Sequence, residues 1–206
     1  MRKKQNYHSI ILVILLTLSL YGCGDTQKLS KLSPDAVILA FGDSLTHGNG
    51  ARESESYPAI LAQLTGRKVI NAGISGEESA QGLARLPALL EEYQPKLLIL
   101  CHGGNDILRQ KDLNKMADNV HAMIVQAKSR NIPVLLLGVP KFGLLLSPLP
   151  VYEEIAESSG AIYVEDLMTD VISDKNLKSD TVHPNGAGYK KIAEGIYAVL
   201  REAGAV

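Results

Sequence analysis

Cysteine is scarce in this sequence: of 206 residues, only Cys23 and Cys101 are cysteines. If Cys23 is modified at the start of the mature chain, as argued below, Cys101 stands alone and no internal disulfide can form. Cys101 follows the apolar run 97–100, which favours a buried thiol in the core. A nucleophile and base made of Cys101 and His102 is disfavoured, because adjacent side chains of an extended segment point to opposite faces.

Long hydrophobic runs are also few. The longest largely apolar run, Ile10–Leu20, has 11 residues, fewer than the roughly 18 that a membrane-spanning helix needs. A basic start, Arg2 to Lys4, precedes it, and the two together form the pattern of a signal peptide that is removed. We therefore expect residues 1–22 to take no part in the fold.

The signal ends in Leu20-Tyr21-Gly22-Cys23. A small residue followed by cysteine at this place resembles a bacterial lipobox, in which the cysteine becomes the lipidated first residue. Cys23 would then anchor the protein to a membrane, with residues 23–34 as a polar tether. The protein would lie in the cell envelope of a bacterium, periplasmic or held by its anchor. The alternative is an ordinary secretory signal, or an uncleaved anchor, with no special role for Cys23.

Basic charge is sparse as well. Removal of residues 1–22 takes three of the 21 lysines and arginines and none of the 22 acidic residues, so the net charge changes from −1 to −4. No basic run remains, which argues against nucleic acid as a partner.

What the sequence does contain is an alternation of apolar runs and amphipathic stripes. Apolar residues recur at spacings of three and four within 83–93, 113–127 and 192–200, which predicts helices with one buried face. The alternation predicts an α/β fold in one domain, residues 35–206: a doubly wound, flavodoxin-like sheet of about five parallel strands with helices on both faces. Runs typical of strands covered on both faces are 36–41, 68–70, 96–101, 133–138 and 161–164.

Ser44 follows the first of these runs, behind Gly42 and Asp43. Open α/β sheets bind their ligands at the carboxyl ends of the strands, so this serine is placed to act as a nucleophile. Its alternative role is that of a helix cap. The surrounding residues lack the Gly-Lys of a Walker loop and the G-x-S-x-G of α/β-hydrolases. A flavin phosphate loop over residues 44–50 would leave the motifs described next unexplained.

Asp180 and His183 lie just before the last predicted helix. Imidazole ionises near neutral pH and suits a general base, while Asp180 can accept the other ring N–H and fix the tautomer. Pro184 favours an extended backbone at His183. The alternative is a surface loop with a solvated aspartate and a capping histidine.

Gly73 and Asn105 follow two further strands. Attack on an ester places negative charge on the carbonyl oxygen, where each preorganised donor contributes roughly 3 kcal/mol. The candidate donors are the backbone N–H of Gly73, the side-chain amide of Asn105 and the backbone N–H of Ser44. Gly73 could equally be a turn residue, and Asn105 a helix cap.

These residues lie in four blocks: Phe41–Leu45, Asn71–Gly76, Gly103–Asp106 and Asp180–Asn185. The blocks resemble those of the GDSL/SGNH hydrolase family, over a span from Ala36 to Gly195. They are most similar to the single-domain periplasmic enzymes described as acyl thioesterase, arylesterase and lysophospholipase. Cys101 and His102 depart from that subgroup, which tends to have an acidic or apolar residue and a leucine there.

The resemblance implies a serine esterase that hydrolyses acyl esters or thioesters through an acyl-enzyme intermediate, without a metal or a cofactor. Ser44 would be the nucleophile, His183 the base and Asp180 its partner. The oxyanion hole would comprise Ser44, Gly73 and Asn105. The expected partner is a small acyl-ester or lipid-like substrate, and we expect a monomer.

Two alternatives remain: a carbohydrate O-deacetylase of the same superfamily, and a non-catalytic surface lipoprotein that keeps the fold as a binding module. The presence of Ser44, Asp180 and His183 argues against the second. A loop after the fourth strand carries four candidate substrate-binding residues, which either receive an acyl chain or pack over the base of their own loop. These residues are Phe142, Leu144, Leu145 and Leu146.

Overall fold

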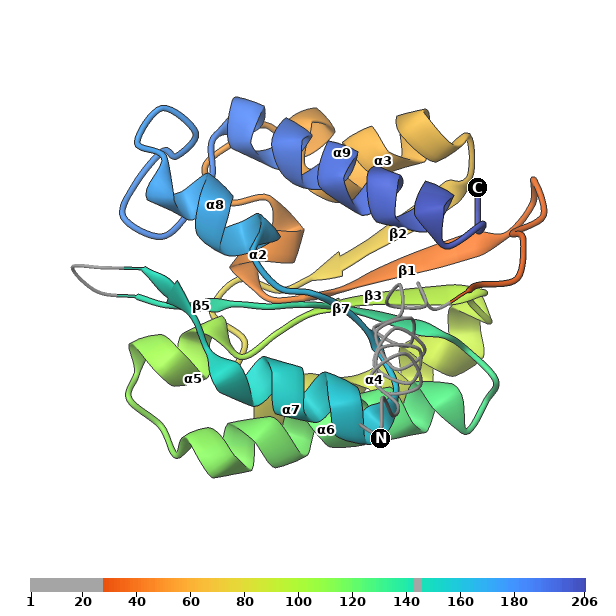
Figure 1. The fold of residues 1–206 in the computed structure, drawn as a ribbon, viewed down its shortest axis with the longest axis horizontal. Coiled ribbons are helices and arrows are strands. Elements are labelled where there is room, and N and C mark those ends of the chain that lie inside the picture. Colours follow the sequence, from red (N-terminus) through yellow and green to blue (C-terminus); the bar gives the residue numbers. More distant parts are fainter. Residues whose placement is uncertain (1–27, 143–145) are drawn as a thin grey trace, which may run out of the picture.

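The computed structural model describes residues 28–142 and 146–206. The predicted signal peptide and Cys23 lie outside these residues, as do Leu144 and Leu145 of the apolar loop. The described chain forms three layers, with a central sheet between two layers of helices (Figure 1).

Five parallel strands form the sheet in the order β2-β1-β3-β4-β7. They are β1 (Val37–Gly42), β2 (Lys68–Gly73), β3 (Leu97–Cys101), β4 (Val134–Leu137) and β7 (Ile162–Val164). This is the flavodoxin-like strand order, so the predicted fold class is confirmed. All residues of β3 and β4 are buried, which explains why these strands are unbroken apolar runs in the sequence.

Helices cover both faces of the sheet (Figure 1). One face carries α3 (Tyr57–Thr65), α8 (Leu167–Ser173) and α9 (Gly186–Glu202), and the other carries α4 (Ser79–Tyr93), α6 (Leu113–Lys128) and α7 (Pro150–Ser159). The predicted stripes correspond to α4, α6 and α9. The hydrophobic pattern did not predict α3, α7 and α8. These helices are short, with 9, 10 and 7 residues, and offer few turns over which a period can be recognised.

The connections on the carboxyl side of the strands contain short elements that the sequence did not predict. These are α2 (Ser44–His47), the 3₁₀ turn η2 (Glu53–Glu55), α5 (Gly104–Leu108) and the antiparallel pair β5 (Pro140–Lys141) and β6 (Ser147–Pro148). Strand β2 also runs three residues beyond its predicted end, because its main chain pairs with β1 as far as Gly73 opposite Gly42. Main-chain pairing needs no apolar side chain, so this extension leaves no mark in the hydrophobic pattern.

The described part of the predicted tether lies against the domain. The N–H of Leu29 donates to the Ala203 carbonyl at 2.9 Å, and that of Leu32 to the Ala205 carbonyl at 2.8 Å. Leu32 is buried and belongs to the core. The chain therefore enters the domain beside its own C-terminal end. Among the described residues, no helix is both long and apolar enough to cross a membrane.

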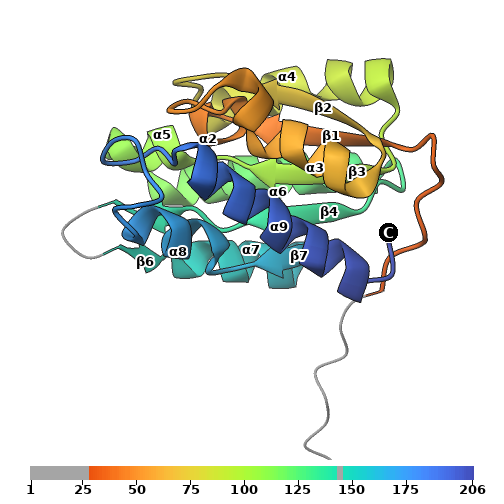
Figure 2. The ribbon, with the colours of Figure 1, turned by 90° about the horizontal axis from the view of Figure 1, so that it is seen from above.

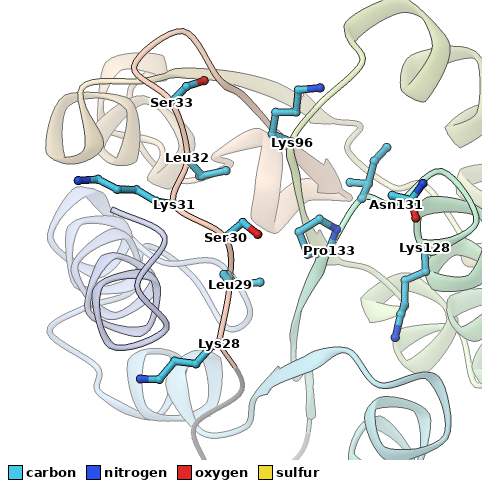
Figure 3. Close-up of a pocket in the computed structure, with 11 residues that line it drawn as sticks. Lys28, Leu29, Ser30, Lys31, Leu32, Ser33, Lys96, Lys128, Asn131 and Pro133 are labelled. Carbon is cyan, nitrogen blue, oxygen red and sulfur yellow. The ribbon is translucent and has the colours of Figure 1, made fainter.

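A hollow of about 590 Å³ lies where the chain enters, at the amino ends of β3 and β4. Four lysines line it: Lys28, Lys31, Lys96 and Lys128. Figure 3 shows that they point in different directions and do not converge on one point. Lys128 Nζ donates to the main-chain carbonyls of Ser159 and Gly160 at the end of α7, at 2.5 and 2.9 Å. The hollow contains none of the predicted site residues.

Candidate active site

Ser44 is the first residue of α2, directly beyond the carboxyl end of β1. The buried Asp43 caps this short helix, accepting a hydrogen bond from the Leu45 N–H at 3.0 Å. Gly42 makes the turn possible, because a Cβ there would lie 2.0 Å from the Cys101 carbonyl oxygen. The Ser44 hydroxyl is consequently presented at the rim of the sheet.

Asp180 and His183 come from the loop between α8 and α9. The loop is closed by the Ser179 N–H, which donates to the His183 carbonyl at 2.9 Å. Asp180 Oδ1 accepts the N–H groups of Val182 and His183, both at 2.8 Å. These contacts fix the aspartate and the imidazole on the same side of the loop.

A chain of hydrogen bonds joins this loop to Ser44. Asp180 Oδ2 lies 2.8 Å from His183 Nδ1, and His183 Nε2 lies 2.9 Å from Ser44 Oγ. An ionised Asp180 can only accept, so Nδ1 carries the hydrogen and Nε2 is left to accept the Ser44 hydroxyl proton. Burial opposes ionisation of Asp180. The N–H of Val182 and the bonds from His183 outweigh it and lower the pKa of Asp180.

Asn105 enters the site at the start of α5, after Gly103, whose φ of 104° is in the left-handed region. One hydrogen of its side-chain amide goes to the Glu77 carbonyl oxygen, with Nδ2 3.1 Å from that atom. An amide nitrogen carries two hydrogens, so the second remains for another acceptor. Asn105 and Ser44 line one narrow hollow together with His183.

Gly73, predicted to be an oxyanion donor, is the last residue of β2. Its N–H donates to Asn71 Oδ1 at 3.0 Å, and it borders another hollow, beside His47 and Gly48. A Cβ at Gly73 would lie 2.1 Å from the His47 nitrogen, so glycine is required for the close approach of β2 to α2. This packing is a structural reason for a glycine at this position.

The apolar wall of the narrow hollow is formed by Leu45, Leu108, Phe142 and Val182. Phe142, one of the four loop residues predicted to contact substrate, therefore lies beside Ser44. Leu146 is half-buried and packs against the core.

Cys101 and His102 do not form a nucleophile and base. The Cys101 thiol is fully buried in β3, and burial raises the pKa of this thiol well above its usual range. The ring of His102 contacts Glu77 and Gly103. This agrees with the interpretation of Cys101 as a core thiol.

The model of the GDSL-like lipase/acylhydrolase family matches residues 40–191. The chain belongs to this family. It is 31% identical over 195 residues to Esterase TesA of Pseudomonas aeruginosa, in an alignment that covers 89% of this chain and 97% of the relative. It is also 31% identical over 166 residues to the Escherichia coli K12 protein named thioesterase 1/protease 1/lysophospholipase L1, with 77% and 80% covered.

Solved structures of this family have the same fold. Esterase EstA from Pseudoalteromonas sp., inhibited by monoethylphosphonate, superposes with a TM-score of 0.72 at 30% identity, over 82% of this chain and 98% of that one. The crystal structure of TesA gives a TM-score of 0.73 at 30% identity, over 81% and 99%. As a member of the GDSL-like family, the protein is a serine hydrolase.

The sequence did not single out Gly76 or Glu77, which lie in the connection after β2 of this GDSL-like hydrolase, nor the contact of His102 with Glu77. Gly76 has a φ of 78° and lies in a turn closed by the Glu77 N–H, which donates to the Ile74 carbonyl at 3.2 Å. In the described part of the chain, the Gly76 N–H has no hydrogen-bond acceptor. The motif Ile74-Ser75-Gly76 contains this turn. A glycine in a loop does not by itself show that its backbone is left-handed or that its N–H lacks an acceptor.

Proposed function

We propose that this protein hydrolyses acyl esters or thioesters through an acyl-enzyme intermediate on Ser44. The observation that carries the proposal is the hydrogen-bonded chain from Asp180 through His183 to Ser44 Oγ, with both side-chain links shorter than 3 Å. This is the order of acid, base and nucleophile that serine hydrolases need.

In the first half of the reaction, Ser44 Oγ bonds to the substrate carbonyl carbon while its proton passes to His183 Nε2. The tetrahedral intermediate then collapses. The bond to the leaving oxygen or sulfur breaks, and His183 returns the proton to that atom. Asp180 stays ionised, because its lowered pKa favours the carboxylate, and stabilises the imidazolium between the two transfers.

In the second half, water replaces the leaving group. His183 Nε2 takes a proton from the water as its oxygen bonds to the acyl carbon. Collapse of this second intermediate breaks the bond to Ser44 Oγ, which recovers the proton from His183. The products are the free carboxylic acid and the unmodified enzyme.

The oxyanion would be bound by the Ser44 N–H, by the second amide hydrogen of Asn105 and by a third N–H. Gly73 was the predicted third donor, but its N–H is engaged by Asn71 Oδ1. We favour Gly76, whose N–H has no acceptor among the described residues and whose neighbour Glu77 holds the Asn105 amide through its carbonyl. Donors that are fixed before the reaction contribute most, because they need no reorganisation.

The narrow, partly apolar hollow suits a substrate with a small or slender acyl group beside Ser44. The related proteins named above carry the names esterase, thioesterase and lysophospholipase, and a further relative from Vibrio mimicus is named arylesterase. Ester, thioester and lysophospholipid hydrolysis are therefore the activities to test first. The O-deacetylase alternative is tested in the same series.

A substrate panel decides among these activities: p-nitrophenyl esters of increasing chain length, an acyl thioester, a lysophospholipid and an acetylated sugar. The residue 28–206 protein and its Ser44→Ala variant are compared on each substrate. Ser75→Ala is the matched control, since this nearby hydroxyl contacts Asn49 and not His183. Hydrolysis that persists in Ser44→Ala would contradict the acyl-enzyme on Ser44, and turnover of the acetylated sugar alone would favour the deacetylase.

We further propose that the mature protein is a monomer in the bacterial cell envelope, anchored through a lipidated Cys23. The support is the order of basic start, apolar run and Gly22-Cys23 in the sequence. Cys23→Ser should release the full-length protein from membranes or block its processing. Wild-type protein recovered in soluble form, with no added lipid mass, would indicate an ordinary secreted enzyme, and light scattering of the isolated domain reports its oligomeric state.

A further inference from the structure

A buried polar cluster lies behind the proposed oxyanion donors. It consists of Glu77, Arg85 and His102, and we refer to it as the Glu77 cluster. His102 is fully buried and Glu77 is 6% exposed. Ionised and polar side chains are rarely buried unless they are paired, so the contacts of this cluster are informative.

His102 connects two loops through its two ring nitrogens. Nδ1 accepts the N–H of Gly103 at 3.0 Å, and Nε2 lies 3.1 Å from Glu77 Oε2. Because Nδ1 accepts, the ring hydrogen is on Nε2 and points to the carboxylate. The Tyr152 hydroxyl also donates to the His102 carbonyl at 2.7 Å. The imidazole is therefore held at both ring nitrogens, and the main chain of the same residue is held at its carbonyl.

Glu77 is the residue that connects His102 with Asn105. Its carboxylate receives two hydrogen bonds from Arg85, at 2.8 Å from Nε and 2.6 Å from Nη2. Burial opposes ionisation of Glu77, but the bonds from His102 and Arg85 outweigh it and lower the pKa of Glu77. The main-chain carbonyl of the same residue accepts the Asn105 amide. Glu77 thus contacts His102 and Arg85 through its carboxylate and Asn105 through its carbonyl.

Helix α4 is adapted to this imidazole. A Cβ at Gly82 would lie 2.3 Å from His102 Nε2, so any side chain there would displace the ring. Glycine within a helix costs roughly 0.5–1 kcal/mol relative to alanine. The glycine that makes room for His102 therefore lowers the stability of helix α4.

We infer that His102 is a positioning residue for the oxyanion hole: through Glu77, it holds the Asn105 amide in the orientation that binds the developing negative charge. The inference rests on the proposed function. It assigns a role to a residue that touches neither the nucleophile nor the base. It also explains why a buried histidine precedes Gly103, in a segment that otherwise consists of apolar strand residues.

His102→Leu tests the inference, because it replaces the imidazole with an apolar side chain of moderate size and removes both ring contacts. Loss of one positioned oxyanion donor costs about 100-fold or more in kcat, so we expect kcat to fall by about 30- to 100-fold and KM to change by less than about threefold. His102→Gln, which can still donate to Glu77, should recover at least about tenfold of that loss.

A double-mutant cycle with Asn105→Ala separates positioning from general damage. If His102 acts through Asn105, adding His102→Leu to Asn105→Ala should lower kcat by less than about threefold further. Two losses that multiply would show that His102 contributes independently of Asn105 and would overturn the inference. A kcat for His102→Leu within about threefold of the parent would overturn it as well.

Two controls keep these outcomes distinct. Ser44→Ala is measured in parallel: activity in that variant refutes the proposed function, whereas an inactive Ser44→Ala beside an unaffected His102→Leu refutes only the role of His102. Thermal unfolding is followed for each variant. If His102→Leu does not fold, His102→Asn is used under the same criteria, because it keeps an acceptor for the Gly103 N–H and withdraws the donor to Glu77.

Discussion

The two ends of the sheet differ in how their polar side chains are arranged. At the carboxyl ends of the strands, loops from four parts of the chain converge on a narrow hollow. Hydrogen bonds there join Asp180, His183 and Ser44 through their side chains, and Asn105 to the Glu77 carbonyl. At the amino ends lies a hollow of about 590 Å³ whose lysines diverge. Two of them, Lys28 and Lys128, bind the carbonyls that end helices, where positive charge is favourable. Convergent chemistry, rather than the size of a hollow, therefore identifies the site.

The strongest test of this contrast is removal of the nucleophile at the carboxyl end. Ser44→Ala should lower kcat by about 10⁴-fold or more and abolish labelling by a fluorophosphonate probe, since no other described hydroxyl contacts the imidazole ring of His183. The melting temperature should change little. Labelling that persists, at Ser75 or Cys101, would move the reactive residue elsewhere.

Asp180→Asn should lower kcat by about 1,000-fold or more, because an amide favours the wrong imidazole tautomer. The other nearby acids are engaged: Asp43 accepts the Leu45 N–H, and Asp106 accepts the N–H and hydroxyl of Ser79. Steady-state kinetics and circular dichroism of the variant provide the measurement. Activity within about tenfold of the parent would mean that a different acid supports His183.

Asn105→Ala should lower kcat by about 100-fold, with little change in KM, since its donor acts mainly in the transition state. Asn114→Ala is a matched control: this exposed asparagine lies in the first turn of α6 and lines no part of the narrow hollow. A rise in KM at constant kcat would instead make Asn105 a group that binds the substrate.

The pH dependence should show one acidic limb. His183 accepts the Ser44 proton only when its imidazole is neutral, so kcat/KM should fall about tenfold per pH unit in the acidic range and level off in mildly alkaline buffer. The lowered pKa of Asp180 keeps this carboxylate ionised across the limb, so it adds no second step there. Two acidic ionisations in kcat/KM, measured from pH 5 to 9, would contradict this account.

The smallest effect is expected at the amino end. Lys128→Gln removes the donor to the Ser159 and Gly160 carbonyls and should lower the melting temperature by no more than about 3 °C. It should leave kcat/KM unchanged. A loss of activity on any substrate of the panel would show that the two ends are coupled.

Local patterns predicted most of the sheet and most of the site. Burial on both faces gives β1, β3 and β4 their unbroken apolar runs, and the residues after them are those that meet at one edge. Ser44, Asp180 and His183 were recognised because their chemical types are distinctive and each follows a strand or precedes a helix.

The remaining contacts could not be predicted, because some join residues distant in sequence through the main chain and others depend on the rotamer of a side chain. The bond from Asn105 to the Glu77 carbonyl spans 28 positions and leaves no side-chain signature at the acceptor. The engagement of Gly73 by Asn71 likewise depends on a local rotamer. Of the residues of the Glu77 cluster, His102 alone stood out in the sequence, where it departs, together with Cys101, from the subgroup that the chain resembles.

The docking of Leu29 and Leu32 on the C-terminal end has a consequence for orientation. It leaves at most about 18 Å of extended chain between Cys23 and Lys28. Lys28 donates to the Glu202 carbonyl near the C-terminus, and the C-terminus lies at the opposite end of the molecule from β6 (Figure 2). Strand β1 alone adds about 17 Å before Ser44 is reached. An enzyme held by Cys23 would thus turn its catalytic face away from its own bilayer. It would meet esters that diffuse through the surrounding fluid or are presented by an opposing surface, and lipids of the leaflet beneath it would be out of reach.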